Sequence, residues 1–222
     1  MSARARFFDA RLASALAAGA AQQVVVLAAG YDSSAYRFKG GFLAAKFFEV
    51  DLPRVSEAKR ALVAATLPPG AAAGAAFVSA DLSSPRQLRG ALLPEGFDPS
   101  KPTVWLAQGL MMYLPAAAIA ALLRELRALS APGSRLVFDA PDAAAVSSGG
   151  GLQGARLGFE VTKAATDLVG ETVFSSVDLS PQGADALAAA FGYRCVDLVG
   201  YGAEGGRSFG RLTRCVEWAV DA

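Results

Sequence analysis

The sequence predicts an α/β protein whose core is a mainly parallel β-sheet with helices on both faces. Short apolar runs alternate with longer stretches of helical periodicity, the order expected of strand–helix–strand units. The apolar runs are nearly continuous, as in strands that are buried on both sides. The chain has 222 residues, of which 53% are hydrophobic, which suits one sizeable domain and is too short for two ordinary ones. We therefore expect residues 1–222 to form a single domain.

Five apolar runs are the candidate strands of the parallel part of the sheet. In chain order they are Val24–Leu27, Phe47–Val50, Ala76–Ser79, Val104–Leu106 and Arg135–Phe138. Helices are expected between them, near Val55–Ala65, near Pro85–Leu92 and over Ala116–Ser130. The third of these helices has the clearest limits, because Pro115 precedes it and the sequence APGS follows it.

The N-terminal segment MSARARFFDARLASALAAGAAQQ admits two interpretations. Its arginines, its alanines and its single acidic residue are typical of an organellar transit peptide. Phe8, Leu12, Ala15 and Leu16, however, recur on one face of a helix, which indicates a first amphipathic helix. This helix would lead directly into the first strand. We expect the helix, and with it a cytoplasmic location; an organellar stroma is the alternative.

The pattern changes after the fifth strand. Residues 143–158 are rich in glycine, serine and alanine and are expected to form a flexible loop that leads into a helix. The wider stretch 143–172 is the expected insertion that shapes a substrate pocket. Pro181–Phe191 predicts another helix, and the runs YRCVDLVGY and RLTRCVEWAV predict two final strands. These last two strands are expected to pair antiparallel at one end of the sheet.

The composition argues against several classes of partner. A formal net charge of +1 gives no basic excess for binding nucleic acid. No apolar stretch reaches the roughly 20 residues that span a bilayer. Cys195 and Cys215 are too few for a disulfide framework or a zinc site, and the chain has no histidine that could assist them. We expect no metal, no nucleic acid and no membrane partner, while the oligomeric state stays open.

The segment VVVLAAGYDSSAYRF reads as a strand followed by a loop of small residues, which lets a ligand approach the backbone closely. A dinucleotide-binding loop has the pattern G-x-G-x-x-G, and its three glycine positions are here Ala28, Gly30 and Ser33. Asp51, about 20 positions further on, could accept hydrogen bonds from ribose hydroxyls. The loop therefore suits S-adenosylmethionine, an adenosine ligand without pyrophosphate, better than NAD(P). An NAD(P)-dependent oxidoreductase is the alternative.

Several motifs in a fixed order resemble a known family. They are RARFFDARL, VVVLAAGYDSSAYRF, FFEVDLPRVSEAK, VSADLSS, PTVWLAQGLMMYLP and APGSRLVFD. From about Arg4 to Asp139, and more weakly to the C-terminus, the chain resembles the leucine carboxyl methyltransferase family, in particular its bacterial-type O-methyltransferase branch. The resemblance implies S-adenosylmethionine as cofactor. It also implies the Rossmann-like class I methyltransferase fold, a mainly parallel seven-stranded sheet with an antiparallel C-terminal strand.

The resemblance also implies which residues bind the methionine and ribose parts of the cofactor. Arg6, with Arg4 as the alternative, matches the arginine that pairs with the methionine carboxylate. Ala28 and Gly30 match the loop under the methionine moiety. Asp51 matches the ribose-binding acid; Glu49, two residues earlier, is expected on the same side of its strand.

Two further sites follow from the same resemblance. Asp81 and Leu82 match a pair that contacts adenine, although Asp81 could instead cap the helix that follows. Gln108 stands where the family commonly has glutamate, and it lacks the negative charge that would attract the cofactor's amine or sulfonium. Ser34 stands where an arginine is common. Family members usually carry further N-terminal helices that close the pocket, so we expect these lid helices to be short or absent.

Methyl transfer from a sulfonium is an in-line displacement, in which alignment alone contributes roughly 7–11 kcal/mol. A carboxylate acceptor is already ionised at neutral pH and needs no base, which agrees with a chain that lacks histidine. A phenol or alcohol would need one, for which Tyr113, Asp139 and Asp142 are candidates. We expect transfer to oxygen, on a small-molecule or protein carboxylate. Because Gln108, Ser34 and the lid depart from the family, a weak or inactive cofactor-binding module is the alternative.

Overall fold

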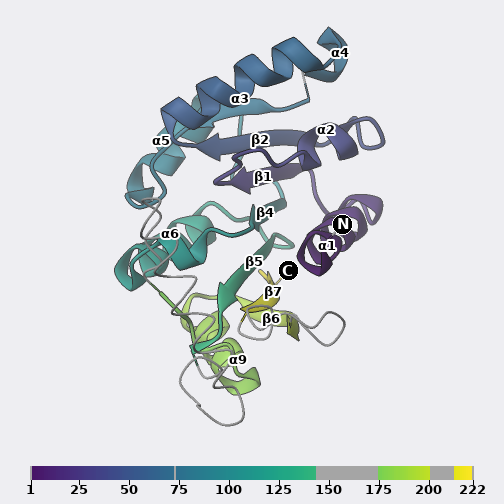
Figure 1. Ribbon diagram of the computed structural model, residues 1–222. Coiled ribbons are helices and arrows are strands. Elements are labelled where there is room, and N and C mark those ends of the chain that lie inside the picture. The colour runs from purple at the N-terminus through teal and green to yellow at the C-terminus, as the bar shows by residue number, and fades with distance from the viewer. Residues whose placement is uncertain (1, 73, 144–174, 201–212, 222) are drawn as a thin grey trace.

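The computed structural model describes residues 2–72, 74–143, 175–200 and 213–221 (Figure 1). Within these ranges a seven-stranded sheet has the order β3-β2-β1-β4-β5-β7-β6. Its strands are β1 (Gln23–Leu27), β2 (Lys46–Asp51), β3 (Ala76–Ser79), β4 (Thr103–Ala107), β5 (Arg135–Pro141), β6 (Arg194–Gly200) and β7 (Thr213–Ala219). All seven expected strands are confirmed, with limits that differ by a few residues.

The first five strands pair in parallel, as predicted. Strand β7 lies between β5 and β6 and runs antiparallel to both. The expected antiparallel pairing of the last two strands is therefore confirmed. Its position was not predicted, because the last strand inserts beside β5 and leaves β6 beyond it. Strand β5 also extends past Phe138 to Pro141, so that Asp139 lies within the sheet.

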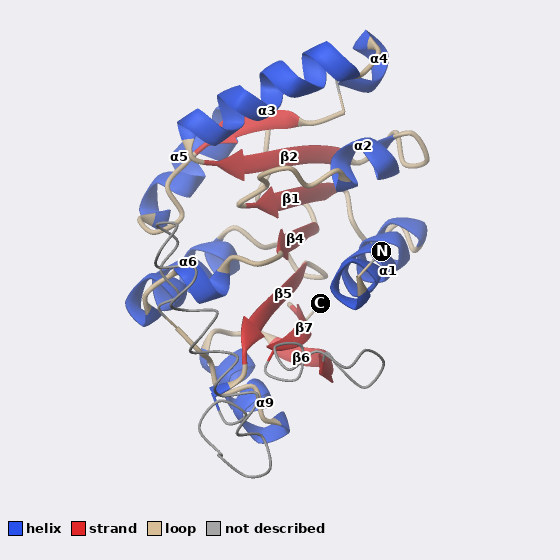
Figure 2. Cartoon of the chain, viewed as in Figure 1, coloured by secondary structure: helices blue, strands red, loops and turns tan. Residues whose placement is uncertain are grey.

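Helices cover both faces of the sheet. They are α1 (Ala3–Ala17), α2 (Ser34–Lys39), α3 (Pro53–Thr66), α4 (Pro69–Ala72), α5 (Leu88–Leu92), α6 (Ala116–Ala128) and α9 (Pro181–Ala190). Figure 2 shows α5, α6 and α9 on one side of the sheet and α1 and α2 on the other. The expected helix near Pro85–Leu92 is in part a 3₁₀ turn over Pro85–Gln87, so α5 itself is short. Helix α2 was not predicted.

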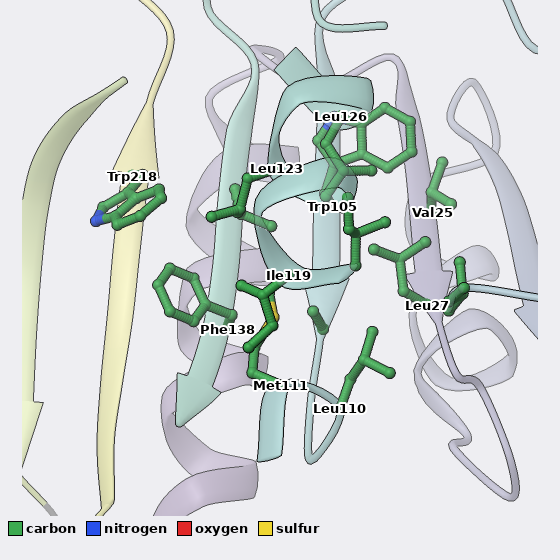
Figure 3. Packing of buried hydrophobic residues seen from close by; sticks show 14 of the residues in the cluster. Val25, Leu27, Trp105, Leu110, Met111, Ile119, Leu123, Leu126, Phe138 and Trp218 are labelled. Atoms are coloured by element: carbon green, nitrogen blue, oxygen red, sulfur yellow. The ribbon is translucent and has the colours of Figure 1, made fainter. Parts of the chain in front are cut away.

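The alternation of side chains along each strand divides the core into two layers. In β1, Val25 and Leu27 pack with α6, whereas Val24 and Val26 pack with α1. Figure 3 shows the first layer, in which Trp105 lies beneath α6 and Phe138 lies beside Trp218. Burial on both faces explains the nearly continuous apolar runs of the sequence.

Helix α1 buries the four apolar residues that the sequence placed on one face, namely Phe8, Leu12, Ala15 and Leu16. The amphipathic helix expected there is therefore confirmed. Of the expected pocket insertion 143–172, all but Ala143 lies outside the described residues. Among the helices that the structure describes, none has both the length and the apolar character that crossing a membrane requires.

Candidate functional site

A cavity of about 220 Å³ opens at the carboxyl ends of β1 and β4. In open α/β sheets, ligands bind at such ends, where neighbouring strands continue into helices on opposite faces. Strands β1 and β4 meet this condition, because α2 and α6 lie on opposite faces. The described residues that line the cavity are Arg4, Val26, Leu27, Ala28, Ala29, Gly30, Tyr31, Asp32 and Gln108.

The loop after β1, residues 28–32, forms one wall of the cavity and has an unusual backbone. Ala28 and Gly30 have φ values of 50° and 39°, in the left-handed region. This region costs an alanine roughly 1–2 kcal/mol, so the surrounding contacts must hold it there. Two contacts lie within the loop and its exit: the Asp32 nitrogen donates to the Ala29 carbonyl at 2.7 Å, and Asp32 Oδ1 accepts from the Ser34 nitrogen at 2.7 Å.

Asp51, at the end of β2, is bonded to this loop. Its Oδ2 accepts a hydrogen bond from the Gly30 nitrogen at 2.8 Å, and its Oδ1 accepts one from the Leu52 nitrogen at 2.7 Å. Each carboxylate oxygen can accept a further hydrogen bond. The structure therefore brings together Asp51 and Gly30, two of the residues expected to bind the cofactor.

Arg4 and Gln108 line the cavity from the side of α1 and β4. Arg4 Nη1 lies 3.4 Å from Asp139 Oδ2, and Asp139 Oδ1 accepts from the Gly109 nitrogen at 2.6 Å. Burial raises the pKa of Asp139, while the Gly109 N–H and Arg4 act in the opposite direction. Arg6, the first choice from the resemblance, is exposed on α1. The arginine in the described lining of the cavity is Arg4, the alternative.

Three ion pairs among the described residues fix α1, and thereby Arg4, against the rest of the protein; one of them joins Arg11 to Asp197 of β6. Arg37 of α2 donates to both carboxylate oxygens of Asp9, at 2.6 and 2.8 Å. Arg11 lies 3.2 Å from Glu217, whose side chain is buried in β7. Ser34, which departs from the family pattern, is buried at the start of α2 and accepts a hydrogen bond from Arg37. The helix is therefore held at both α2 and the sheet.

Asp81 and Leu82 follow β3 and do not belong to the described lining of the cavity. Asp81 Oδ1 accepts hydrogen bonds from the Ser83 nitrogen and hydroxyl, at 2.8 and 2.7 Å. This turn is close to the capping role that the sequence left open. Leu82 is buried in the core layer beneath α6. Their contact with adenine remains a prediction.

The three candidate bases differ in their surroundings. Asp139 is fully buried; its carboxylate accepts a hydrogen bond from the Gly109 nitrogen and forms an ion pair with Arg4. Asp142 is also buried; its Oδ2 accepts from Arg214 Nε at 2.7 Å. Tyr113 is partly buried and ends the 3₁₀ helix Met111–Tyr113. Both aspartates therefore act as acceptors for neighbouring groups of the protein.

Sequence reasoning assigned no role to Lys59 and placed Glu49 only by the side of its strand. Glu49 does not face the cavity: it is buried behind the loop and paired with Lys59 of α3 at 2.8 Å. Burial raises the pKa of Glu49, and the ion pair with Lys59 opposes that shift. A signal was present, because Val55, Lys59 and Val63 share one face of the helix at a spacing of four residues. A lysine on an otherwise apolar face indicates a buried partner.

The strand order of the sheet and the cavity at the carboxyl ends of β1 and β4 are those of the class I methyltransferase fold. A "putative methyltransferase" from Thermobifida fusca superposes with a TM-score of 0.71 at 18% identity, covering 99% of this chain and 81% of that chain. A DUF574 family protein from Streptomyces avermitilis gives a TM-score of 0.70 at 16% identity, covering 98% and 82%. At such identities the likeness concerns the fold alone.

The sequence gives the family. The sequence model described as leucine carboxyl methyltransferase matches residues 1–127, more than half of the chain, and the chain belongs to this family. A Mycolicibacterium vanbaalenii protein named "Putative S-adenosyl-L-methionine-dependent methyltransferase" is 41% identical over 152 residues. That match covers 66% of this chain and 47% of the relative. The chain thus spans about half the length of the curated relatives it matches.

Proposed function

We propose that this protein is an S-adenosylmethionine-dependent methyltransferase that transfers a methyl group to an oxygen atom, that of a carboxylate. The observation that supports the proposal most is the grouping of Arg4, the Gly30 loop and Asp51 at the switch point of the sheet. These groups offer a cation for a carboxylate, exposed backbone for close approach and an acid for hydroxyls. An amino acid joined to a ribose carries the complementary groups, a carboxylate at one end and hydroxyls at the other.

The residues fit the cofactor at its methionine and ribose end. The cavity of about 220 Å³ is smaller than the roughly 300–1,000 Å³ of sites for whole small molecules, so these residues would enclose part of the ligand. Arg4 would hold the methionine carboxylate, and the loop with Ala28 and Gly30 would lie under the methionine side chain. Asp51 would accept hydrogen bonds from the ribose hydroxyls. When bound, S-adenosylmethionine supplies an activated methyl group on a sulfonium.

The protein's own contribution would be alignment and charge. Arg4 is held between the cavity and Asp139, so its guanidinium is oriented before a ligand arrives. Asp51 is likewise oriented by two backbone N–H donors. Groups that are positioned in advance lose less freedom on binding, and a well-aligned displacement gains roughly 7–11 kcal/mol.

A carboxylate acceptor agrees best with the titratable groups at this end of the sheet. The chain contains no histidine, and Asp139 and Asp142 are buried and already accept hydrogen bonds from the protein. A buried carboxylate with two such partners is poorly placed to take a proton from a phenol or an alcohol. An ionised carboxylate needs no such base.

The proposal is tested by titration calorimetry and by a methylation screen. S-adenosylmethionine and S-adenosylhomocysteine are expected to bind, and NAD and NADP are not. Labelled methyl groups from S-adenosylmethionine should then appear on small-molecule acids or protein C-termini, as esters that mild alkali hydrolyses. Binding of NAD(P) alone would refute the assignment, and label stable to alkali would refute the carboxylate acceptor. Binding without turnover on any acceptor would favour the inactive module.

A further inference from the structure

The ammonium group of Lys59 is buried against the cavity loop, and Lys59 does not belong to the described lining of the cavity. Its side chain is 5% exposed and that of Glu49 is 1% exposed, so the pair is removed from water. Lys59 Nζ donates to Glu49 Oε1 at 2.8 Å, to the Asp32 carbonyl at 2.7 Å and to the Ala29 carbonyl at 3.3 Å. The three protons of the ammonium group therefore have three acceptors.

Two of these acceptors are backbone carbonyls of residues that line the cavity. Ala29 and Asp32 lie on either side of Gly30, whose own N–H is bonded to Asp51. The loop is thus held at its carbonyls by Lys59 and at an N–H by Asp51. Ala28, with its φ of 50°, precedes these contacts directly. A left-handed alanine persists only where its neighbours hold the backbone in place.

Glu49 holds the ammonium group of Lys59 in position through their buried ion pair at 2.8 Å. Glu49 is itself fixed by the Tyr36 hydroxyl, which donates to its Oε2 at 3.1 Å. Strand β2, helix α2 and helix α3 therefore converge on one ammonium group, and that group binds the loop.

We infer that Lys59 is a positioning residue: it holds the loop of residues 28–32 in its ligand-binding conformation through the carbonyls of Ala29 and Asp32. The inference about ligand affinity rests on the proposed function. The inference about the conformation of the loop rests on the hydrogen bonds alone. The two parts can be measured separately.

Three variants separate positioning from general stability. Lys59→Met removes the donors and leaves Glu49 as an unpaired buried charge, which destabilises the protein strongly. Glu49→Leu/Lys59→Met removes both charges, and an apolar pair of this kind often restores stability, but the two loop carbonyls still lack their donor. Arg89→Met is the matched control. It removes an ion pair with Glu125 and a hydrogen bond to the Ala128 carbonyl, and none of these three residues belongs to the described lining of the cavity.

The readouts are amide hydrogen exchange in peptides covering residues 28–34 and the dissociation constant for S-adenosylhomocysteine. Both Lys59 variants should exchange these amides about tenfold faster and bind about tenfold more weakly, the effect of one or two lost hydrogen bonds. Arg89→Met should change neither readout. The double variant is the decisive one, because it regains stability without regaining the donors. It also carries the test if Lys59→Met does not fold.

Wild-type exchange and affinity in the double variant would overturn the inference, because Lys59 would then act only by balancing the charge of Glu49. Unchanged exchange in Lys59→Met would overturn it as well. If the wild-type protein does not bind S-adenosylhomocysteine, the proposed function fails, and hydrogen exchange alone decides whether Lys59 holds the loop.

Discussion

Asp51 Oδ2 lies 2.8 Å from the backbone nitrogen of Gly30, so the acid that ends one strand is bonded to the loop that follows its neighbour. The parallel register of β1 and β2 makes this possible, because Leu27 pairs with Val50 and both strands end at the same level. Asp51 does not itself belong to the described lining of the cavity; it adjoins the cavity through its bond to Gly30, which does. Asp51 therefore holds the loop in the free protein, and it would also accept hydrogen bonds from the proposed ribose.

Asp51→Ala is expected to weaken the binding of S-adenosylhomocysteine by about 1–3 kcal/mol, because ribose hydroxyls and the Gly30 N–H would lose their acceptor. Calorimetric titration of wild type and variant measures the change. Asp51→Asn should recover part of the loss, since the amide oxygen can still accept from Gly30. Equal affinity in Asp51→Ala and wild type would show that the acid only closes the loop.

Arg4→Met is expected to weaken S-adenosylhomocysteine binding by about 1.5–3 kcal/mol, the value of a charge-assisted hydrogen bond to a carboxylate. Arg6→Met is the matched control, because it changes the same residue type on the same helix at an exposed position. It should leave the affinity within about twofold of wild type. If the two results are exchanged, Arg6 is the carboxylate ligand, as the family resemblance first suggested.

Asp81 and Asp98 form the same turn: each accepts hydrogen bonds from the nitrogen and the hydroxyl of the serine two residues later. They differ in location, since Asp81 follows β3 and Asp98 precedes β4. If Asp81 also contacts adenine, Asp81→Ala weakens cofactor binding by about 1–3 kcal/mol, whereas Asp98→Ala does not. Similar small losses of stability in both variants, with unchanged affinity, would make Asp81 a turn residue only.

Burial raises the pKa of Asp139 above its unfolded value, so this group makes the protein less stable as the pH rises. The contribution of this group is fully present below the unfolded pKa and is lost as pH rises through the folded pKa. The unfolding free energy of wild type minus that of Asp139→Asn should therefore decrease as pH rises above about 4, the ordinary value of an aspartate. Urea titrations at several pH values measure it; a difference that grows with pH would contradict the raised pKa.

Local sequence patterns predicted most of the fold because its elements depend on local burial. The five parallel strands are continuous apolar runs, and α1 has one apolar face, so periodicity was sufficient. The place of β7 between β5 and β6 depends on pairings such as Asp139 with Cys215, across many residues of chain. No local pattern specifies such a pairing.

The candidate site divides in the same way. Gly30, Asp51 and Gln108 each follow a predicted strand, and the parallel sheet brings such residues to one edge. The choice between Arg4 and Arg6 depends on how α1 is rotated and docked, which ion pairs on three other elements determine. Lys59 was given no role, although its place on the buried face of its helix was a signal, because two of its three partners are backbone carbonyls, which side-chain identities do not reveal.

Gln108 lines the cavity together with Arg4, at the position where the family commonly has an acid. Gln108→Glu would add a charge that attracts the ammonium and sulfonium groups of the cofactor, and it should tighten S-adenosylmethionine binding by about 1.5–3 kcal/mol. S-adenosylhomocysteine, which lacks the sulfonium, should gain less. Gln108→Met is the control that removes hydrogen bonding without adding charge.

The competing outcome also follows from the structure. A new carboxylate beside Arg4 could pair with that guanidinium and draw it away from the methionine carboxylate, in which case both ligands would bind more weakly than to wild type. Tighter binding together with faster methyl transfer would show that the missing charge limits methyl transfer by this protein. Unchanged binding, with brisk turnover by the wild-type protein, would show that the glutamine is no defect and would remove the argument that Gln108 provides for an inactive module.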